Sequence, residues 1–457
     1  MDWSPAIVDR HGPVYLRVVE ALRADVASGR LHRGQQLPTQ RALAKALGID
    51  LTTVTRAYTE ARRQGLIEAR VGQGTFVAES VSQAPRALGQ RAEIDLSMNI
   101  PPQPLEADLD GRILRGLTSI QSETGFFGLL NYRQPGGSPE ERAVAAAWLA
   151  RRVAGVTPDT VLVGSGTQTA ILAFLLANTS RGDVVLAEDL TFPGFRAAAT
   201  YASVRAVGVP MDGEGIIPEA LDEACRQHAP KAVYLIPTVQ NPTAATMPEK
   251  RRKAVARVIG SHDVQLFEDD AYGLLAPEAA PLAALMPERT TWAVSLSKCL
   301  APGLRVSLLN APNPAAAARL ADALRAAVQM APPLMAAMVM RWLQDGSADR
   351  IIAAIRSEAA ARQRIAAQAL AGVRFAADPR GHHIWLPLPP HWTRTAFLAH
   401  LQRQGLAVVA GEVFSLGEAP HAIRVSLGAA RSRAELATAL DILAAAFRSA
   451  AATSHIV

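Results

Sequence analysis

Apolar residues recur at helical spacing in three short stretches near the start of the chain. The first predicted helix begins at Val14 and ends before Gly29, because a valine or leucine recurs there at every fourth position. The second covers 40–47, follows a suitable N-cap residue at Thr39, and ends at a glycine. The third is predicted over 52–64, where apolar residues again share one face.

Two short apolar runs follow these helices, at 66–71 and 75–77, with the turn Gly72-Gln73-Gly74 between them. Their spacing predicts a β hairpin. Three short helices and a glycine-tipped hairpin together predict a winged helix-turn-helix, whose third helix enters the DNA major groove. A three-helix protein-interaction module is the alternative, since helical spacing alone does not exclude it.

From about residue 140, short apolar runs alternate with helical stretches. The runs predicted as strands are 161–163, 184–187, 232–236, 264–267 and 292–295. This alternation predicts an α/β fold with a mainly parallel sheet and helices on both faces. Residues 79–94 show little periodicity and predict a linker, so we expect one domain at 1–78 and another over 95–457.

The composition excludes disorder as the general state, since 49% of the 457 residues are hydrophobic and 19% are charged. Two cysteines in so long a chain fit a reducing compartment rather than a disulfide scaffold. No basic leader precedes an apolar block, and no apolar run approaches the ~20 residues of a membrane span. We therefore expect a cytoplasmic protein with no membrane partner.

Most of the net charge of +6 lies in the first sixth of the chain, where 1–78 hold eleven Lys/Arg and seven Asp/Glu. A basic excess in a small module favours double-stranded DNA as its partner, and ordinary scatter of charge is the alternative. Hydroxyls and first-turn amides of the third helix suit phosphates, and arginines suit phosphates or base edges. The candidate DNA-binding residues are Arg41, Thr52, Thr53, Thr55, Arg56, Arg70 and Gly74.

Polar residues gather directly after the predicted strands, where ligands bind in parallel α/β sheets. These motifs are Gly164-Ser-Gly-Thr-Gln168, Pro237-Thr-Val-Gln-Asn-Pro-Thr243, Glu268-Asp-Asp-Ala-Tyr272 and Ser295-Leu-Ser-Lys298. A lysine beside hydroxyls and a small-residue phosphate cradle suits a Schiff base with pyridoxal phosphate, whose ring nitrogen needs a carboxylate. Each residue alone has an ordinary explanation, such as a surface lysine, a helix cap or a turn. Their joint occurrence favours this cofactor, and no metal site is expected.

Four N-terminal segments carry a family resemblance. They are Gly34-Gln-Gln-Leu-Pro-Thr-Gln-Arg-Ala-Leu-Ala-Lys-Ala-Leu-Gly48, Thr52-Thr-Val-Thr-Arg-Ala-Tyr58, Gly65-Leu-Ile67 and Gly72-Gln-Gly-Thr-Phe-Val77. These segments resemble the GntR family of bacterial winged-helix repressors. The chain departs from that family at Leu51, where arginine is frequent, so one DNA contact expected from the family is missing.

The segment Ser295-Leu-Ser-Lys-Cys-Leu-Ala-Pro-Gly-Leu-Arg305 is similar to the lysine segment of fold-type I aminotransferases. The resemblance implies pyridoxal phosphate as cofactor and Lys298 as the catalytic Schiff-base residue. It also implies a large domain at about 125–310 and a small domain formed by the N-terminal segment and about 325–457. By the same resemblance, the phosphate is held by Gly166, Thr167, Gln168, Ser295, Ser297 and Arg305, the ring nitrogen by Asp269, the ring oxygen by Asn241 and Tyr272, and the ring face by Phe192.

Two further segments add a subunit contact and an effector contact to this resemblance. Asn131-Tyr-Arg-Gln-Pro-Gly-Gly137 is similar to a segment whose tyrosine reaches the partner subunit's phosphate, so Tyr132 implies a homodimer. His421-Ala-Ile-Arg-Val-Ser-Leu427 is similar to the segment whose arginine binds a substrate carboxylate, which gives Arg424 that role. The chain departs from the family at Ala244, where glycine is usual, and at Phe192, where tyrosine is common.

A GntR-like head fused to an aminotransferase-like body resembles the MocR/GabR group of bacterial regulators. The resemblance implies a pyridoxal-phosphate-dependent regulator that binds an operator, associates with the nucleoid and senses an amine or amino acid through aldimine exchange at Lys298. Two alternatives stay open. In the first, the body is a working aminotransferase and the DNA-binding head is accessory. In the second, the regulator senses pyridoxal phosphate itself.

Overall fold

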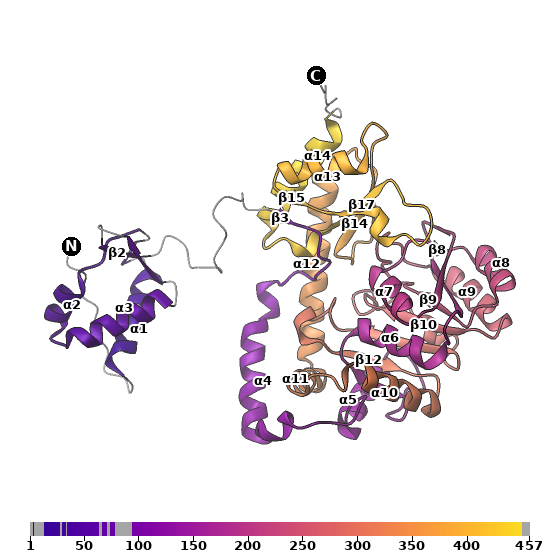
Figure 1. Ribbon diagram of the computed structural model, residues 1–457, viewed down its shortest axis with the longest axis horizontal. Helices are drawn as coiled ribbons and strands as arrows, with labels where there is room; N and C mark the ends of the chain where they lie inside the picture. The colour runs from indigo at the N-terminus through magenta and orange to yellow at the C-terminus, as the bar shows by residue number, and fades with distance from the viewer. Residues whose placement is uncertain are drawn as a thin grey trace. The chain divides into compact units, whose positions relative to one another are not determined.

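The chain forms two compact units, Met1–Arg91 and Ala92–Val457, here called the head and the body (Figure 1). The computed structural model describes residues 3, 13–27, 30–32, 34–63, 66–70, 74–77 and 94–449. Val71 at the end of the predicted first run, Gly72 and Gln73 of the predicted turn, and the predicted linker up to residue 93 lie outside this part. Within the described part, no helix is long and apolar enough to cross a membrane.

The head consists of three helices and a two-stranded hairpin. Its elements are α1 (Val14–Ala27), α2 (Gln40–Leu47), α3 (Leu51–Arg63), β1 (Ile67–Arg70) and β2 (Gly74–Val77), with the strands antiparallel. The Thr39 hydroxyl accepts a hydrogen bond from the amide of Ala42, and Gly48 ends α2 at a φ of 63°. The predicted bounds and caps of α2 are confirmed, while α3 begins one residue earlier than predicted and Gln64, the last residue of its predicted range, lies outside the described residues.

The body is built on a seven-stranded sheet in the order β4-β12-β11-β10-β9-β5-β6. Its strands are β4 (Val161–Gly164), β5 (Val184–Glu188), β6 (Arg205–Val209), β9 (Ala232–Leu235), β10 (Gln265–Asp270), β11 (Thr290–Ser295) and β12 (Ser307–Asn310). Neighbouring strands are parallel except at β12, which is antiparallel to both neighbours. The mainly parallel sheet and the five predicted strands are confirmed. The prediction omitted β6, a partly exposed edge strand, and β12, which has a polar residue at each end.

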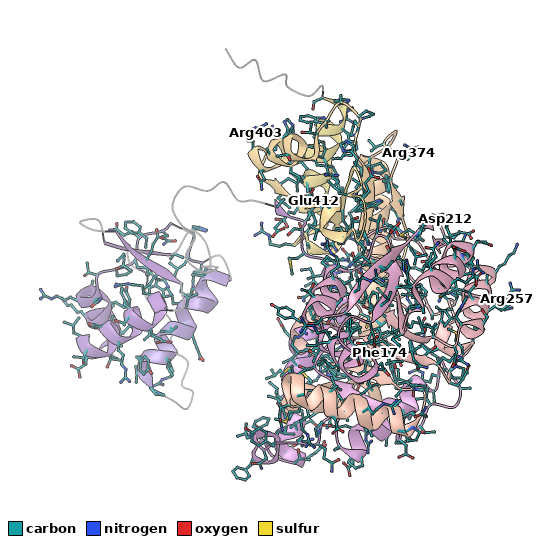
Figure 2. All side chains as sticks on the ribbon, turned by 45° about the vertical axis from the view of Figure 1, so that its right-hand side comes forward. Phe174, Asp212, Arg257, Arg374, Arg403 and Glu412 are labelled. Carbon is teal, nitrogen blue, oxygen red and sulfur yellow. The ribbon has the colours of Figure 1, made fainter. Side chains whose placement is uncertain are left out.

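Helices cover both faces of this sheet. One face packs against α6 (Thr167–Asn178), α7 (Pro193–Tyr201) and α10 (Pro314–Val328), and the other against α5 (Pro139–Leu149), α8 (Pro218–His228), α9 (Glu249–Ser261) and α11 (Pro333–Gln344). Phe174 of α6 lies 5.1 Å from Phe267 of β10, ring centre to ring centre, inside the body (Figure 2). Because both faces are buried, polar side chains of the strands reach open space at the strand ends.

The C-terminal part of the body has its own core. It comprises α12 (Ser347–Ala369), α13 (Arg394–Arg403), α14 (Arg433–Arg448) and the strands β13 (Ala376–Ala377), β14 (His383–Pro387), β15 (Leu406–Ala407), β16 (Val409–Ala410) and β17 (Ala422–Ser426). The body also contains α4 (Leu109–Glu123), β7 (Met211–Asp212) and β8 (Gly215–Ile216). The short strand β3 (Ile94–Asp95) pairs in parallel with β15, so the start of the body is anchored on this C-terminal part.

Candidate functional site

A cavity of about 450 Å³ lies in the body at the ends of the sheet strands. Its walls come from β10 and β11, the start of α6, the segment 97–100 and the C-terminal part around β17. Most residues that the sequence assigns to cofactor and effector line it, namely Thr167, Gln168, Phe192, Asn241, Asp269, Tyr272, Ser295, Ser297, Lys298, Arg305 and Arg424. Gly166 lies beside the cavity without lining it, and Tyr132 lies elsewhere on the surface.

Lys298 follows β11 and carries the candidate nucleophile. Its Nζ donates a hydrogen bond of 2.5 Å to the backbone oxygen of Asn99. Burial and the positive charge of Arg424 lower the pKa of Lys298 to about 8, against the opposing pull of Asp269. An amine with such a pKa keeps a sizeable neutral fraction at physiological pH, and the neutral form is the nucleophile.

Asp269 and Asp270 end β10 and point to opposite sides of the sheet, as successive strand residues must. Asp269 lines the cavity, and its Oδ2 accepts a hydrogen bond of 2.7 Å from the Tyr234 hydroxyl. Burial raises the pKa of Asp269 to about 6, so the group is still ionised at neutral pH. Asp270 instead accepts a 3.0 Å hydrogen bond from Nε1 of Trp292 in the core.

The Tyr272 hydroxyl is the last group in a series of polar contacts that runs through Asn99 and His383. Asn99 donates from Nδ2 to the Tyr272 hydroxyl at 2.6 Å, and the same nitrogen lies 3.3 Å from Nδ1 of His383. On its other side, Nε2 of His383 lies 3.0 Å from the backbone oxygen of Gln240. Burial raises the pKa of Tyr272 well above its ordinary value, so the hydroxyl keeps its proton.

A tight turn before α6 forms the candidate phosphate cradle. Gly166 has a φ of 90°, and a Cβ at this position would lie 2.5 Å from Nη2 of Arg305. The turn therefore requires glycine. Arg305 itself donates from Nη2 to the backbone oxygen of Ser165 at 3.2 Å. Free amides at the start of a twelve-residue helix, two serines and an arginine form a suitable phosphate site.

Phe192 and Gln168 form one wall of the cavity beside Gly194. Nε2 of Gln168 donates a 2.8 Å hydrogen bond to the backbone oxygen of Gly194. A Cβ on Gly194 would lie 1.9 Å from Oε1 of Gln168 and 2.3 Å from Cε1 of Phe192. The close approach explains why this position has no side chain.

Arg424 belongs to β17 in the C-terminal part of the body, and it lines the cavity. It donates from Nη1 to Oδ1 of Asn241 at 2.9 Å and from Nη2 to the backbone oxygen of Ser97 at 2.5 Å. Its guanidinium lies 4.9 Å from the ring centre of Phe414. Nearby Ala244, which replaces the usual glycine, adopts a φ of 60°, a left-handed conformation that is costly for a residue with a Cβ.

The residues present fit pyridoxal phosphate, as two unpartnered atoms show. Among the described residues, neither Oδ1 of Asp269 nor Oγ1 of Thr167 has a hydrogen-bond partner, although both atoms are buried. A pyridinium nitrogen suits the first and a phosphate oxygen suits the second. No cluster of metal-ligating side chains occurs within the described part of the chain.

The predicted DNA-binding residues lie mostly on the surface of the head. Arg41, Thr52, Thr55 and Arg56 are exposed, and Thr53 is half-buried. The guanidinium of Arg56 lies 4.4 Å from the ring centre of Tyr15, which supports its side chain. Gly74 begins β2 with a φ of 116°, and the side chain of Arg70 lies outside the described residues.

Sequence reasoning missed four residues of the cavity and its surroundings, which are Ser97, Asn99, Tyr234 and His383. Ser97 and Asn99 precede the first strand of the large sheet, and His383 follows it by more than two hundred residues. No local motif marks them. The detectable signal was polarity, because Ser97 and Asn99 alternate with apolar residues in the stretch before two prolines.

Comparison with known families gives two matches that together cover most of the chain. The aminotransferase class I and II family matches residues 94–443, and the gntR family of bacterial regulatory proteins matches residues 14–77. The uncharacterized HTH-type transcriptional regulator YdeF of Bacillus subtilis is 29% identical over 97% of this chain and 96% of its own length. The vitamin B6 salvage pathway transcriptional repressor PtsJ of Salmonella typhimurium is 31% identical over 90% of this chain and 93% of its own length.

Solved structures resemble the body. The α-aminoadipate aminotransferase LysN of Thermus thermophilus, complexed with N-(5'-phosphopyridoxyl)-L-leucine, is 27% identical and has a TM-score of 0.71 over 78% of this chain and 92% of its own. A kynurenine aminotransferase of Pyrococcus horikoshii, at 24% identity and a TM-score of 0.72 over 78% and 91%, shows the same fold. The family match and these neighbours indicate that the body's cofactor is pyridoxal phosphate.

Proposed function

Because the chain belongs to the aminotransferase class I and II family and carries a GntR-family DNA-binding domain, we propose that it is a transcriptional regulator whose cavity senses an amine or amino acid. One observation carries this proposal. Lys298, Asp269 and Arg424 line a single cavity in a chain that also has a DNA-binding head. The cavity therefore offers groups for a cofactor aldehyde, its ring nitrogen and a ligand carboxylate together.

When bound, pyridoxal phosphate supplies an aldehyde that captures amines and a ring that withdraws electrons. Lys298 would supply the amine that holds the cofactor. Asp269, ionised at neutral pH, would keep a proton on the ring nitrogen. Tyr272 and Asn241 would bind the ring oxygen, and Phe192 would cover the ring. The phosphate would be held by Gly166, Thr167, Gln168, Ser295, Ser297 and Arg305.

We propose that the working unit is a homodimer. The exposed fractions of Phe127, Leu130 and Tyr132 are 82%, 80% and 84%. Large apolar side chains so exposed, and grouped in one segment, favour a covered surface. In the dimer Tyr132 would reach the partner's phosphate site, as its segment implies.

We test the proposal with Lys298→Ala in the full-length chain. The wild-type protein loaded with pyridoxal phosphate should absorb visible light, and adding an amino compound should change both the spectrum and the affinity for DNA upstream of its own coding region. Lys298→Ala should lose the visible band and the response to amines, and keep its DNA binding. Arg56→Ala is the matched control, since it should weaken DNA binding and leave the spectra unchanged. A visible band that survives in Lys298→Ala would refute the assignment of Lys298.

A second candidate function is a sensor of pyridoxal phosphate itself. The name of the relative PtsJ, a repressor of vitamin B6 salvage, favours it. DNA binding that responds to pyridoxal phosphate alone, and is indifferent to amines, would support this candidate. Sustained conversion of an amino donor and a keto acceptor would instead support a working aminotransferase.

A further inference from the structure

Tyr234 is a buried phenol whose ring belongs to the core and whose hydroxyl reaches a residue of the cavity. Its exposed fraction is 1%, and the hydroxyl donates a hydrogen bond of 2.7 Å to Oδ2 of Asp269. Burial raises the pKa of Tyr234 well above its ordinary value, so the phenol keeps its proton at neutral pH. The hydroxyl is therefore a donor to this carboxylate throughout the physiological pH range.

The sheet and the aromatic core hold this hydroxyl in place. Tyr234 of β9 lies opposite Phe267 of β10, and Asp269 is the next residue of β10 on the same face of the sheet. The Tyr234 ring stacks on Phe195 of α7, with 4.3 Å between ring centres and 8° between ring planes, and on Phe267 at 5.8 Å. Because two neighbouring rings fix the plane of the phenol, its oxygen has little freedom to turn away from Asp269.

The two oxygens of Asp269 have different surroundings. Oδ2 is occupied by Tyr234, whereas Oδ1 is buried and has no hydrogen-bond partner among the described residues. A carboxylate that is held through one oxygen cannot rotate freely, so its other oxygen keeps one direction. Since Asp269 lines the cavity, Oδ1 is the atom left to accept a hydrogen bond from a ring nitrogen bound there.

Other titratable groups act on the charge of Asp269 in both directions. Lys298 favours the ionised carboxylate, and Asp270 disfavours it. Burial raises the pKa of Glu188 at the end of β5 to about 8, so this carboxyl is neutral at pH 7 and adds no second negative charge. Tyr272 also stays neutral, because burial raises its pKa. Burial and Asp270 thus oppose the ionisation of Asp269, and the hydrogen bond from the β9 phenol opposes them together with Lys298.

Resting on the role proposed above for Asp269, we propose that Tyr234 is a positioning residue that keeps the proton of the cofactor's ring on the ring nitrogen. It does so by donating to Oδ2 and leaving Oδ1 to accept from the ring. Loss of the hydroxyl makes Asp269 a stronger base, and the proton then moves from the ring nitrogen to Oδ1. The N–H bond breaks as the O–H bond forms, so a pyridinium and a carboxylate become a neutral pyridine and a carboxylic acid. A ring without this proton withdraws electrons less strongly.

Tyr234→Phe tests the inference, because it removes the hydroxyl and keeps the stacked rings. The full-length chain is loaded with pyridoxal phosphate that carries nitrogen-15 in its ring, and the nitrogen-15 chemical shift reports whether this atom is protonated. At neutral pH the wild-type chain should show the shift of a pyridinium. Tyr234→Phe should move the signal toward that of a neutral pyridine. Asp269→Asn should complete the move, since an amide carries no charge to pair with a pyridinium.

A second measurement needs no cofactor. In the cofactor-free chain labelled with carbon-13 at its aspartate carboxyls, the Asp269 signal is the one that Asp269→Asn lacks. Its titration midpoint should be near pH 6 in the wild type. In Tyr234→Phe the midpoint should be about one pH unit higher, a tenfold rise in proton affinity.

A 3-fluorotyrosine placed at position 234 alone gives a change of opposite sign. It keeps the aromatic contacts of the core and its hydroxyl donates more strongly, so the Asp269 midpoint should fall. This variant also decides the question if Tyr234→Phe does not fold. A midpoint that stays at the wild-type value in the fluorinated chain would overturn the inference.

Trp292→Phe is the matched control. Trp292 donates from Nε1 to Oδ2 of Asp270 at 3.0 Å, so this change deletes the same kind of bond at the neighbouring carboxylate, away from the cavity. Arg152 remains as the counter-ion, 3.7 Å from the same oxygen. The ring nitrogen should keep its proton in this variant.

The outcomes separate this inference from the proposals on which it rests. A pyridinium shift that is unchanged in Tyr234→Phe, or lost equally in Trp292→Phe, would overturn the role of Tyr234. A ring nitrogen that is indifferent to Asp269→Asn would instead refute the role proposed for Asp269. A chain that takes up no pyridoxal phosphate at all would refute the proposed function.

Discussion

At both Lys298 and Asp269, burial shifts the pKa in one direction and the neighbouring opposite charge shifts it in the other. Burial lowers the pKa of the lysine to about 8 and raises that of the carboxyl to about 6, while their mutual attraction opposes both shifts. Arg424 adds to the effect of burial on Lys298. The cavity thus keeps a carboxylate and a partly neutral amine side by side at neutral pH.

This balance predicts the pH dependence of cofactor uptake. The rate at which the cofactor-free chain takes up pyridoxal phosphate should rise with pH, with a midpoint near 8, because the neutral amine reacts. Asp269→Asn removes a charge that raises the pKa of Lys298, so its midpoint should be lower. Arg424→Met should move the midpoint upward. Stopped-flow absorbance measures the rate, and a wild-type midpoint at the ordinary lysine value of 10.5 would contradict the pKa shift.

At the scale of elements, a few polar residues determine where the helices of the head begin and end. Thr39 caps α2 at its first turn, and Gly48 ends it in a left-handed conformation. α3 follows α2 after a short turn. The Tyr58 hydroxyl on α3 donates a hydrogen bond of 2.8 Å to the backbone oxygen of Pro38, which precedes α2. The helix pair that presents α3 to DNA therefore depends on local caps as well as on its apolar core.

Thr39→Ala should therefore destabilise the head by about 1 kcal/mol, the typical loss for an N-cap hydroxyl. The Thr39 side chain accepts from the amide of Ala42 at 3.3 Å, and alanine leaves that donor to solvent. Thermal unfolding of the full-length chain, followed by exchange of peptides in the head, measures the change. Thr39→Ser keeps the hydroxyl and should retain most of the stability. Equal losses in both variants would show that the cap is not responsible.

At the scale of the whole molecule, the body leaves large apolar side chains on one segment of its surface. Phe127 and Leu130 belong to a short helical turn after α4, and Tyr132 follows it. By the family resemblance, Tyr132 is proposed to reach a partner's phosphate site, and its side chain lies outside the cavity of its own chain. The proposed dimer would bring two heads to one DNA.

Phe127→Asp should weaken this dimer by at least tenfold in dissociation constant, because a charge replaces an apolar side chain at the proposed contact. Sedimentation velocity over a range of concentrations measures the change. Tyr201→Asp, at a residue with an exposed fraction of 84% on α7, is the control and should leave the association unchanged. A wild-type chain that is monomeric at micromolar concentration would contradict the dimer.

Patterns that are local in the chain were enough to predict the two families, the order of helices in the head, the mainly parallel sheet and the cofactor. These features depend on local signals, such as apolar periodicity, caps and motifs at strand ends, which are short in sequence. The family resemblance also implied Asp269 for the ring nitrogen, and Asp269 lines the cavity whereas Asp270 accepts a hydrogen bond from Trp292 in the core.

The distant segments that reach the cavity could be identified only in the folded chain. Asn99 contacts Tyr272 and His383, and Ser97 contacts Arg424, across separations of 173 to 327 residues. No local pattern encodes such contacts, because they arise where the sheet ends, the first strand of the body and the C-terminal part pack together. The pKa shifts depend on the same packing, since burial and neighbouring charges exist only once the chain has folded.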